Sequence, residues 1–138
     1  MTQDLETLIT QALADKVVLV VEDTSSSRML VAGLLRGLGA TKVVAAVDGV
    51  DAMSKITAQK LAPDVVLCDW VMPHMDGLEL LTTLKAVQPG VKFVMMTVKT
   101  EAEAVILARQ NGVDGYVAKP FTRDSIIAAL GKVLKVVA

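Results

Sequence analysis

A short apolar run that ends in a carboxylate constrains this chain more than any other feature. Val65 to Cys68 are all apolar, and Asp69 follows them directly. A run this short and this apolar is typical of a strand buried on both faces, as in a parallel sheet covered by helices. Because open α/β sheets bind ligands beyond the carboxyl ends of their strands, Asp69 is predicted to lie where such a fold does its chemistry.

Four more strands are predicted, at 17–21, 42–47, 92–96 and 115–118, and helices alternate with all five. The alternation implies parallel pairing and right-handed crossovers. A further helix is expected within the first fifteen residues. The pattern predicts these helix residues as buried: Met29, Leu30, Leu34, Leu35, Val50, Met53, Ile56, Ile126, Ile127, Leu130 and Leu134.

Length and composition predict one domain, at 16–138, preceded by an N-terminal helical extension at 1–15. No apolar run is long enough to span a bilayer, and the acidic start is unlike a secretory signal, so no membrane association is expected. The net charge of −1 predicts no nucleic-acid binding. Cys68 is the only cysteine, which fits a cytoplasmic protein and an inert buried thiol.

The strand ends carry the candidate chemistry. Glu22 and Asp23 follow the first strand, Asp69 the third, Thr97 the fourth and Lys119 the fifth. Parallel strands place these ends on one edge of the sheet. Each residue alone would be ordinary at a strand end, but the joint pattern is specific.

Carboxylates this close resist simultaneous ionisation unless a cation lies among them, and Mg²⁺ suits a site of few carboxylates and several waters. The set contains what phosphoryl transfer needs: a carboxylate acceptor in Asp69, charge neutralisation by the metal and Lys119, and a hydroxyl donor in Thr97. His74, in a Pro/Gly loop, is expected to be solvent-exposed rather than a ligand.

Four motifs extend this pattern: VVED at 20–23, DWVMPHMDGLELL at 69–81, MT at 96–97 and GYVAKPFT at 115–122. With them the chain, from Lys16 onward, resembles the receiver domain of two-component response regulators, above all the single-domain type used in chemotaxis. The resemblance implies a doubly wound, flavodoxin-like sheet of five parallel strands in the order 2-1-3-4-5, with five helices besides the N-terminal one.

The resemblance also implies roles for individual residues in the metal site. Asp69 would be the phosphorylated aspartate. Asp23 and Asp69 would bind Mg²⁺ directly, Val71 through its backbone carbonyl, and Glu22 through water.

Three further residues would form the switch. Thr97 and Lys119 would bind the phosphoryl oxygens, and Tyr116 would swing inward as Thr97 moves. The surface made by the helix at 101–111, the last strand and the last helix would then change for an effector.

The implied function is a signalling switch rather than an enzyme, catalysing only its own phosphoryl transfer and autodephosphorylation. The implied partners are a CheA-like sensor histidine kinase or a phosphotransfer protein, and an effector such as a flagellar motor switch component. A phosphate relay or sink outside chemotaxis is the alternative.

Three features depart from the chemotaxis type: Glu22 replaces an aspartate, Val71 replaces an asparagine, and the N-terminal helix is additional. That helix could pack on the domain, mediate dimerisation or lie free. The side chain of Val71 cannot hydrogen-bond near an attacking water, which bears on the lifetime of the phosphorylated state.

Two other functions compete. A flavodoxin-like carrier could hold the phosphate of a flavin or nucleotide at 24–27, but two adjacent carboxylates would repel it, and aromatic residues are scarce. An aspartate-nucleophile phosphatase usually has a second aspartate two residues after the first, where this chain has Val71.

Overall fold

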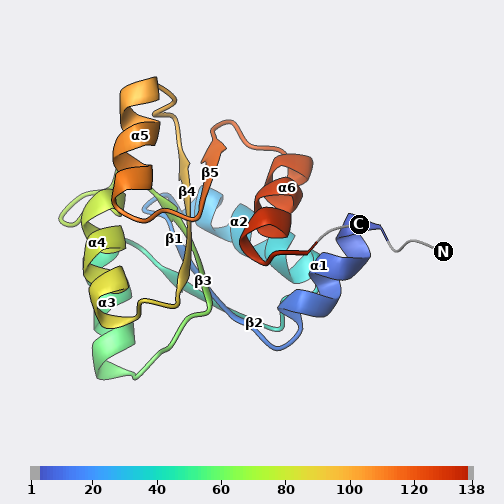
Figure 1. Cartoon of the computed structure of the whole chain (residues 1–138). Coiled ribbons are helices and arrows are strands. Elements are labelled where there is room, and N and C mark those ends of the chain that lie inside the picture. Colours follow the sequence, from blue (N-terminus) through green and yellow to red (C-terminus); the bar gives the residue numbers. More distant parts are fainter. Residues whose placement is uncertain (1–3, 137–138) are drawn as a thin grey trace.

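The computed structural model describes residues 4–136, in which five strands alternate with six helices (Figure 1). The strands are β1 Val17–Val21, β2 Lys42–Ala46, β3 Val65–Asp69, β4 Lys92–Thr97 and β5 Gly115–Ala118. The helices are α1 Leu5–Leu13, α2 Ser25–Gly37, α3 Gly49–Ala58, α4 Gly77–Val87, α5 Ala102–Gln110 and α6 Arg123–Val133. The predicted alternation of strands and helices is confirmed.

All strand pairs are parallel, in the order β2-β1-β3-β4-β5. The order implied by the family resemblance is therefore confirmed. In the register of the sheet, Val21 is paired with Cys68 and Asp69 with Met96. The carboxyl ends of the central strands therefore lie level along one edge.

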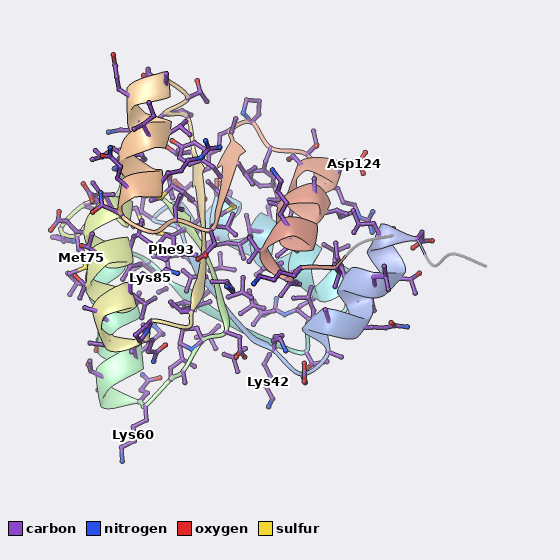
Figure 2. All side chains as sticks on the ribbon, in the orientation of Figure 1. Lys42, Lys60, Met75, Lys85, Phe93 and Asp124 are labelled. Carbon is purple, nitrogen blue, oxygen red and sulfur yellow. The ribbon has the colours of Figure 1, made fainter. Side chains whose placement is uncertain are left out.

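Helices cover both faces of the sheet. In Figure 1, α3, α4 and α5 lie on one side of the strands, with α2 and α6 on the other and α1 outside α6. Successive strand residues point to opposite faces, so Val18 and Val20 join one core while Leu19 and Val21 join the other. Figure 2 shows that side chains fill the space on both sides of the strands.

The N-terminal helix packs on the rest of the domain. Ile9 and Leu13 are fully buried and belong to the core on the α2/α6 face. Leu5 lies so close to α6 that a Cβ on Gly131 would be 3.1 Å from Leu5 Cδ1. Of the three possibilities for this helix, the structure has the packed one. The proposed division at residues 15 and 16 stays a prediction, and residues 1–3 and 137–138 lie outside the described range.

The predicted inward face of α2 is partly wrong. Met29 and Leu30 are 74% and 60% exposed, whereas Val31 and Leu35 are buried. Apolar residues occupy more than one stripe of this helix, and the i, i+4 pair of Val31 and Leu35 is the stripe that meets the sheet. Periodicity alone could not choose between the stripes.

The predicted face of α3 needs a similar correction. Val50 is 53% exposed, while Ala52 and Ile56 are buried. The α3 helix begins at Gly49, which is itself buried, so the buried stripe runs through small residues that the pattern of large apolar side chains overlooks.

Among the described helices, none has the length and apolar character that crossing a membrane requires.

Candidate functional site

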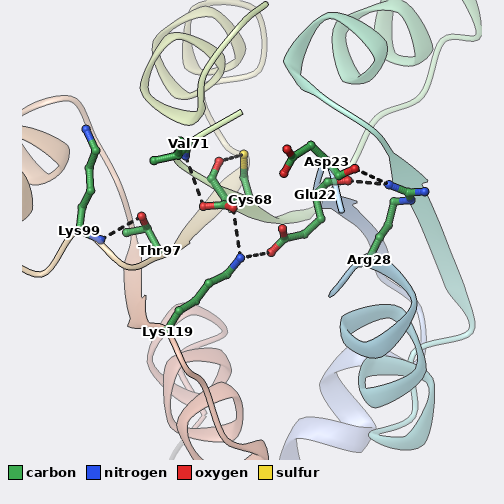
Figure 3. A network of polar contacts seen from close by, with 9 residues as sticks. Glu22, Asp23, Arg28, Cys68, Val71, Thr97, Lys99 and Lys119 are labelled. Atoms are coloured by element: carbon green, nitrogen blue, oxygen red, sulfur yellow. Dashed lines mark hydrogen bonds and ion pairs between the residues drawn. The ribbon is translucent and has the colours of Figure 1, made fainter. Parts of the chain in front are cut away.

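Three carboxylates and one ammonium meet at the carboxyl edge of the sheet (Figure 3). Glu22 and Asp23 follow β1, Asp69 ends β3, and one ligand oxygen from each lies within 4.8 Å of the other two. Lys119, just beyond β5, reaches across the edge to Glu22 and Asp69. Its Nζ lies 2.8 Å from Glu22 Oε1 and 3.1 Å from Asp69 Oδ2.

Hydrogen bonds to backbone carbonyls hold the segments that carry the acids. The Arg28 guanidinium donates to the carbonyl of Glu22 at 2.8 Å and to that of Asp23 at 3.5 Å. The Gly77 N–H donates to the Trp70 carbonyl at 2.8 Å. A Cβ at position 77 would lie 2.5 Å from the Asp69 carbonyl oxygen, so only glycine lets the chain turn this tightly under the site.

Glu22 is the least satisfied residue of the site. It is 1% exposed, and neither of its carboxylate oxygens accepts a hydrogen bond from any described residue. Its contact with Lys119 is thus a close ion pair that lacks hydrogen-bond alignment. Burial raises the pKa of Glu22; Lys119 opposes this rise, and the charges of Asp69 and Asp23 add to it.

Lys119 keeps its positive charge in this setting. Burial alone would lower its pKa, but the contacts with Glu22 and Asp69 outweigh burial and raise it. One ammonium therefore faces three carboxylates, which leaves the pocket short of positive charge.

The donor set fits a hard divalent cation. Buried carboxylate oxygens without a hydrogen bond, in a cluster of three acids, are groups that an oxygen-seeking cation or its waters would satisfy. The chemistry of the site therefore fits Mg²⁺ and the predicted ligands Asp23, Asp69 and Glu22. Val71 lies beside them, and its N–H donates to Asp69 Oδ1 at 3.3 Å.

Thr97 and Tyr116 are joined through one intervening residue. Thr97 is fully buried at the end of β4, and its Oγ1 accepts the Lys99 N–H at 3.2 Å. The Tyr116 hydroxyl donates to the Lys99 carbonyl. Burial raises the pKa of Tyr116, so the phenol stays protonated as a donor. Lys99 thus links Thr97 to Tyr116 through its backbone N–H and carbonyl.

Lys99 and Arg28 were not expected in the site. The Lys99 ammonium lies 4.7 Å from the centroid of the ring of Trp70, the residue that follows Asp69 in the sequence. Nothing in the position of Lys99 along the sequence predicts this contact. Arg28 did carry a signal, because a cation in the first turn of a helix opposes the helix dipole and so suggests another role.

Two remaining predictions concern Cys68 and His74. Cys68 is fully buried, and burial raises the pKa of its thiol well above the usual range, which agrees with an inert role. His74 has an exposed side chain, as expected, yet its Nδ1 lies 3.0 Å from Asp48 Oδ2.

Comparison with known proteins agrees with the geometry. A response regulator receiver domain model matches residues 18–131. Chemotaxis protein CheY-3 of Vibrio cholerae is 36% identical over 86% of this chain and 91% of its own. Chemotaxis protein CheY of Pseudomonas aeruginosa is 34% identical over 86% of this chain and 95% of its own. The solved structure of Vibrio cholerae chemotaxis protein CheY4 superposes with a TM-score of 0.78 at 30% identity, covering 86% and 98% of the two chains.

Proposed function

Because this chain belongs to the response regulator receiver family, we propose that it is a phosphorylation-controlled signalling switch whose acceptor is Asp69. The observation that carries the proposal is the pocket in which one ammonium, that of Lys119, bridges Glu22 and Asp69 while three carboxylates lie within 4.8 Å of one another. This pocket holds three carboxylates and one ammonium, so it favours the binding of a divalent cation together with a phosphoryl group.

Each residue has a definite task in the proposed phosphoryl transfer. A carboxylate oxygen of Asp69 attacks the phosphorus of a phosphohistidine, the P–N bond breaks, and the released imidazole takes up a proton. Lys119 balances charge on the phosphoryl oxygens, and Thr97 donates its hydroxyl to one of them. Asp23, Asp69 and the Val71 carbonyl would hold Mg²⁺, with Glu22 acting through water. When bound, the metal would supply positive charge that neutralises the carboxylates and the phosphoryl oxygens.

The proposed switch runs from the pocket to the β5 surface. Once phosphorylated, Asp69 would draw the Thr97 hydroxyl toward it. The Lys99 N–H would lose its acceptor, and Tyr116, which is bonded to the Lys99 carbonyl, would adjust its position. The α5–β5–α6 surface would then bind an effector, in the manner of a two-state equilibrium shifted by the modification.

The relatives suggest the setting. All three relatives described above are named chemotaxis proteins, at 30% to 36% identity. We therefore favour a cytoplasmic role in chemotaxis, with a CheA-like kinase or phosphotransfer protein as donor and a flagellar motor switch component as effector. A relay or sink outside chemotaxis would use the same pocket and differ only in its partner.

Acetyl phosphate tests the acceptor. With Mg²⁺, the wild-type chain should gain one phosphoryl group by mass spectrometry, and Asp69→Asn should gain none because it lacks the nucleophile. Chelation of Mg²⁺ should suppress labelling of the wild type. An Asp69→Asn chain that is labelled as fully as the wild type would refute the assignment.

Lys119→Met tests the switch. The variant keeps an unbranched side chain only one atom shorter but removes the charge that would contact the phosphoryl group. Mg²⁺ should therefore still bind, while phosphorylation no longer alters the α5–β5–α6 surface. Hydrogen exchange at Tyr116 and in α5, with and without beryllofluoride, measures the change. A response equal to that of the wild type would contradict the role of Lys119.

A further inference from the structure

The loop that carries Val71 is fastened to the start of α3. His74 Nδ1 lies 3.0 Å from Asp48 Oδ2, while Asp48 Oδ1 accepts the Asp51 N–H at 2.8 Å as the N-cap of α3. One buried carboxylate thus caps a helix and holds a loop at the same time. The Asp51 N–H, followed by the His74 ring, lowers the pKa of Asp48, which keeps this carboxylate ionised.

The backbone on both sides of this pair is equally close. A Cβ on Gly49 would lie 2.8 Å from the Met75 carbonyl oxygen, so the first residue of α3 and the loop are in direct contact. His74 itself has φ +68°, a left-handed conformation that is unfavourable for a residue other than glycine. The chain keeps a side chain at this position, and that side chain is the one that reaches Asp48.

We propose that Asp48 and His74 are a positioning pair that holds loop 70–76 in the conformation that presents the Val71 carbonyl to Mg²⁺. The proposal rests on the metal site of the proposed function, and neither residue is a ligand. Trp70 and Met72 are buried in the core on the α3/α4 face, so the loop is anchored at its first half. Its other hydrogen bonds are local: Val71 N–H donates to Asp69 Oδ1, Met75 N–H to the Pro73 carbonyl, and Gly77 N–H to the Trp70 carbonyl. The Asp48–His74 contact is a polar tie from this loop to another element.

Because His74 is exposed, an effect on the position of the loop can be distinguished from an effect on the stability of the fold. Its side chain is 71% exposed, so changing it removes little packing. A loss of Mg²⁺ affinity without a loss of folding would therefore report the position of the loop.

Two variants of the same shape isolate the contact. His74→Asn keeps a donor near the place of Nδ1, and asparagine tolerates the left-handed backbone. His74→Asp has the same shape and the same tolerance, but its carboxylate repels Asp48. The added negative charge would by itself strengthen Mg²⁺ binding, so weaker binding can only come from the displaced loop. Lys55→Gln is the control, because it breaks an ion pair on the same helix, at 2.9 Å from Asp51, without touching the loop.

Two measurements are made on the full chain. Trp70 fluorescence gives the Kd for Mg²⁺, and hydrogen exchange of the Val71, Met75 and Gly77 amides in metal-free protein gives the order of the loop. We expect His74→Asn and Lys55→Gln to match the wild type. His74→Asp should raise the Kd about tenfold, the size expected for an outer-shell partner, and should speed exchange of the loop amides.

The outcomes separate this proposal from the proposed function. Equal Kd values and equal exchange for His74→Asp and His74→Asn would overturn the positioning role while leaving the phosphorylation switch intact. A wild-type chain that neither binds Mg²⁺ nor accepts a phosphoryl group would overturn the proposed function itself. If His74→Asp is the only variant that loses thermal stability, and its Kd rises to the extent that this loss explains, the pair has a structural role and the positioning role is rejected.

Discussion

Acidic residues serve opposite purposes at the two edges of this sheet. At the amino edge, Asp64 and Asp114 each precede a strand and accept a backbone N–H of a neighbouring strand. Asp64 Oδ2 lies 2.7 Å from the Val17 nitrogen, and Asp114 Oδ2 lies 2.8 Å from the Phe93 nitrogen. At the carboxyl edge, Glu22, Asp23 and Asp69 instead crowd one another.

The direction of the strands explains the difference. The first N–H groups of parallel strands lack some of their partners at the amino edge, so a carboxylate there completes the hydrogen bonding. At the carboxyl edge, Glu22 stays buried beside two other carboxylates, with the Lys119 ammonium as its one ion-pair partner among the described residues. One edge stabilises the fold, whereas the other retains an unfavourable charge arrangement that a ligand can relieve, and such arrangements are typical of functional sites.

The largest effect on folding is expected at the amino edge. Asp114→Ala removes the acceptor of the Phe93 N–H and the partner of Lys85, whose Nζ lies 2.7 Å from Asp114 Oδ2. Leaving a buried donor unpaired should lower the free energy of unfolding by about 2 to 3 kcal/mol, measured by urea denaturation. The Kd for Mg²⁺ should not change, because the variant lies at the opposite edge. A changed Kd at unchanged stability would show that the two edges are coupled.

A smaller effect of opposite sign is expected at the carboxyl edge. Glu22→Gln keeps the shape of the side chain and removes a buried charge, so without metal it should raise the free energy of unfolding by roughly 1 to 2 kcal/mol at neutral pH. It should weaken Mg²⁺ binding at the same time. A loss of stability instead would mean that the ion pair with Lys119 outweighs the burial of Glu22.

The pH dependence of this gain has a definite sign. Burial raises the pKa of Glu22 in the folded state above its ordinary value of 4.5, so the folded chain binds the proton more tightly than the unfolded chain does. The contribution of Glu22 to the stability of the wild type is therefore lost as the pH rises through 4.5 and up to the folded pKa. The advantage of Glu22→Gln should be smallest in acid and reach its full size above the folded pKa. Urea denaturation of both chains across this range, without metal, measures the difference.

The sequence predicted those features that depend on strand direction. An apolar run followed by an acid indicates both a buried strand and the edge at which the acid emerges, so Glu22, Asp69 and Lys119 could be expected to meet. Contacts that depend on loop conformation could not be predicted in this way. The Asp48–His74 pair needs the left-handed backbone of His74, and the exposure of Met29 depends on which stripe of α2 meets the sheet.

The smallest expected effect comes from a pair of lysines, one at each edge. Lys85 donates to the Val91 carbonyl and pairs with Asp114 at the amino edge, where its side chain is partly buried. Lys99 at the carboxyl edge makes no ion pair with a described residue and lies over the Trp70 ring. Lys85→Met should therefore cost about 1 kcal/mol of folding free energy, and Lys99→Met only about 0.5 kcal/mol.

Spectroscopy can separate the two lysines where stability barely does. Removing the ammonium from above Trp70 should shift the emission of the only tryptophan in Lys99→Met and leave it unchanged in Lys85→Met. If Lys99→Met costs as much stability as Lys85→Met, the carboxyl edge contributes to folding as the amino edge does, and the contrast between them fails. If Lys99→Met lowers the folding free energy only slightly and mainly shifts the emission, the fold does not hold Lys99 in place. Lys99 can then move together with Thr97 and Tyr116, as the proposed switch requires.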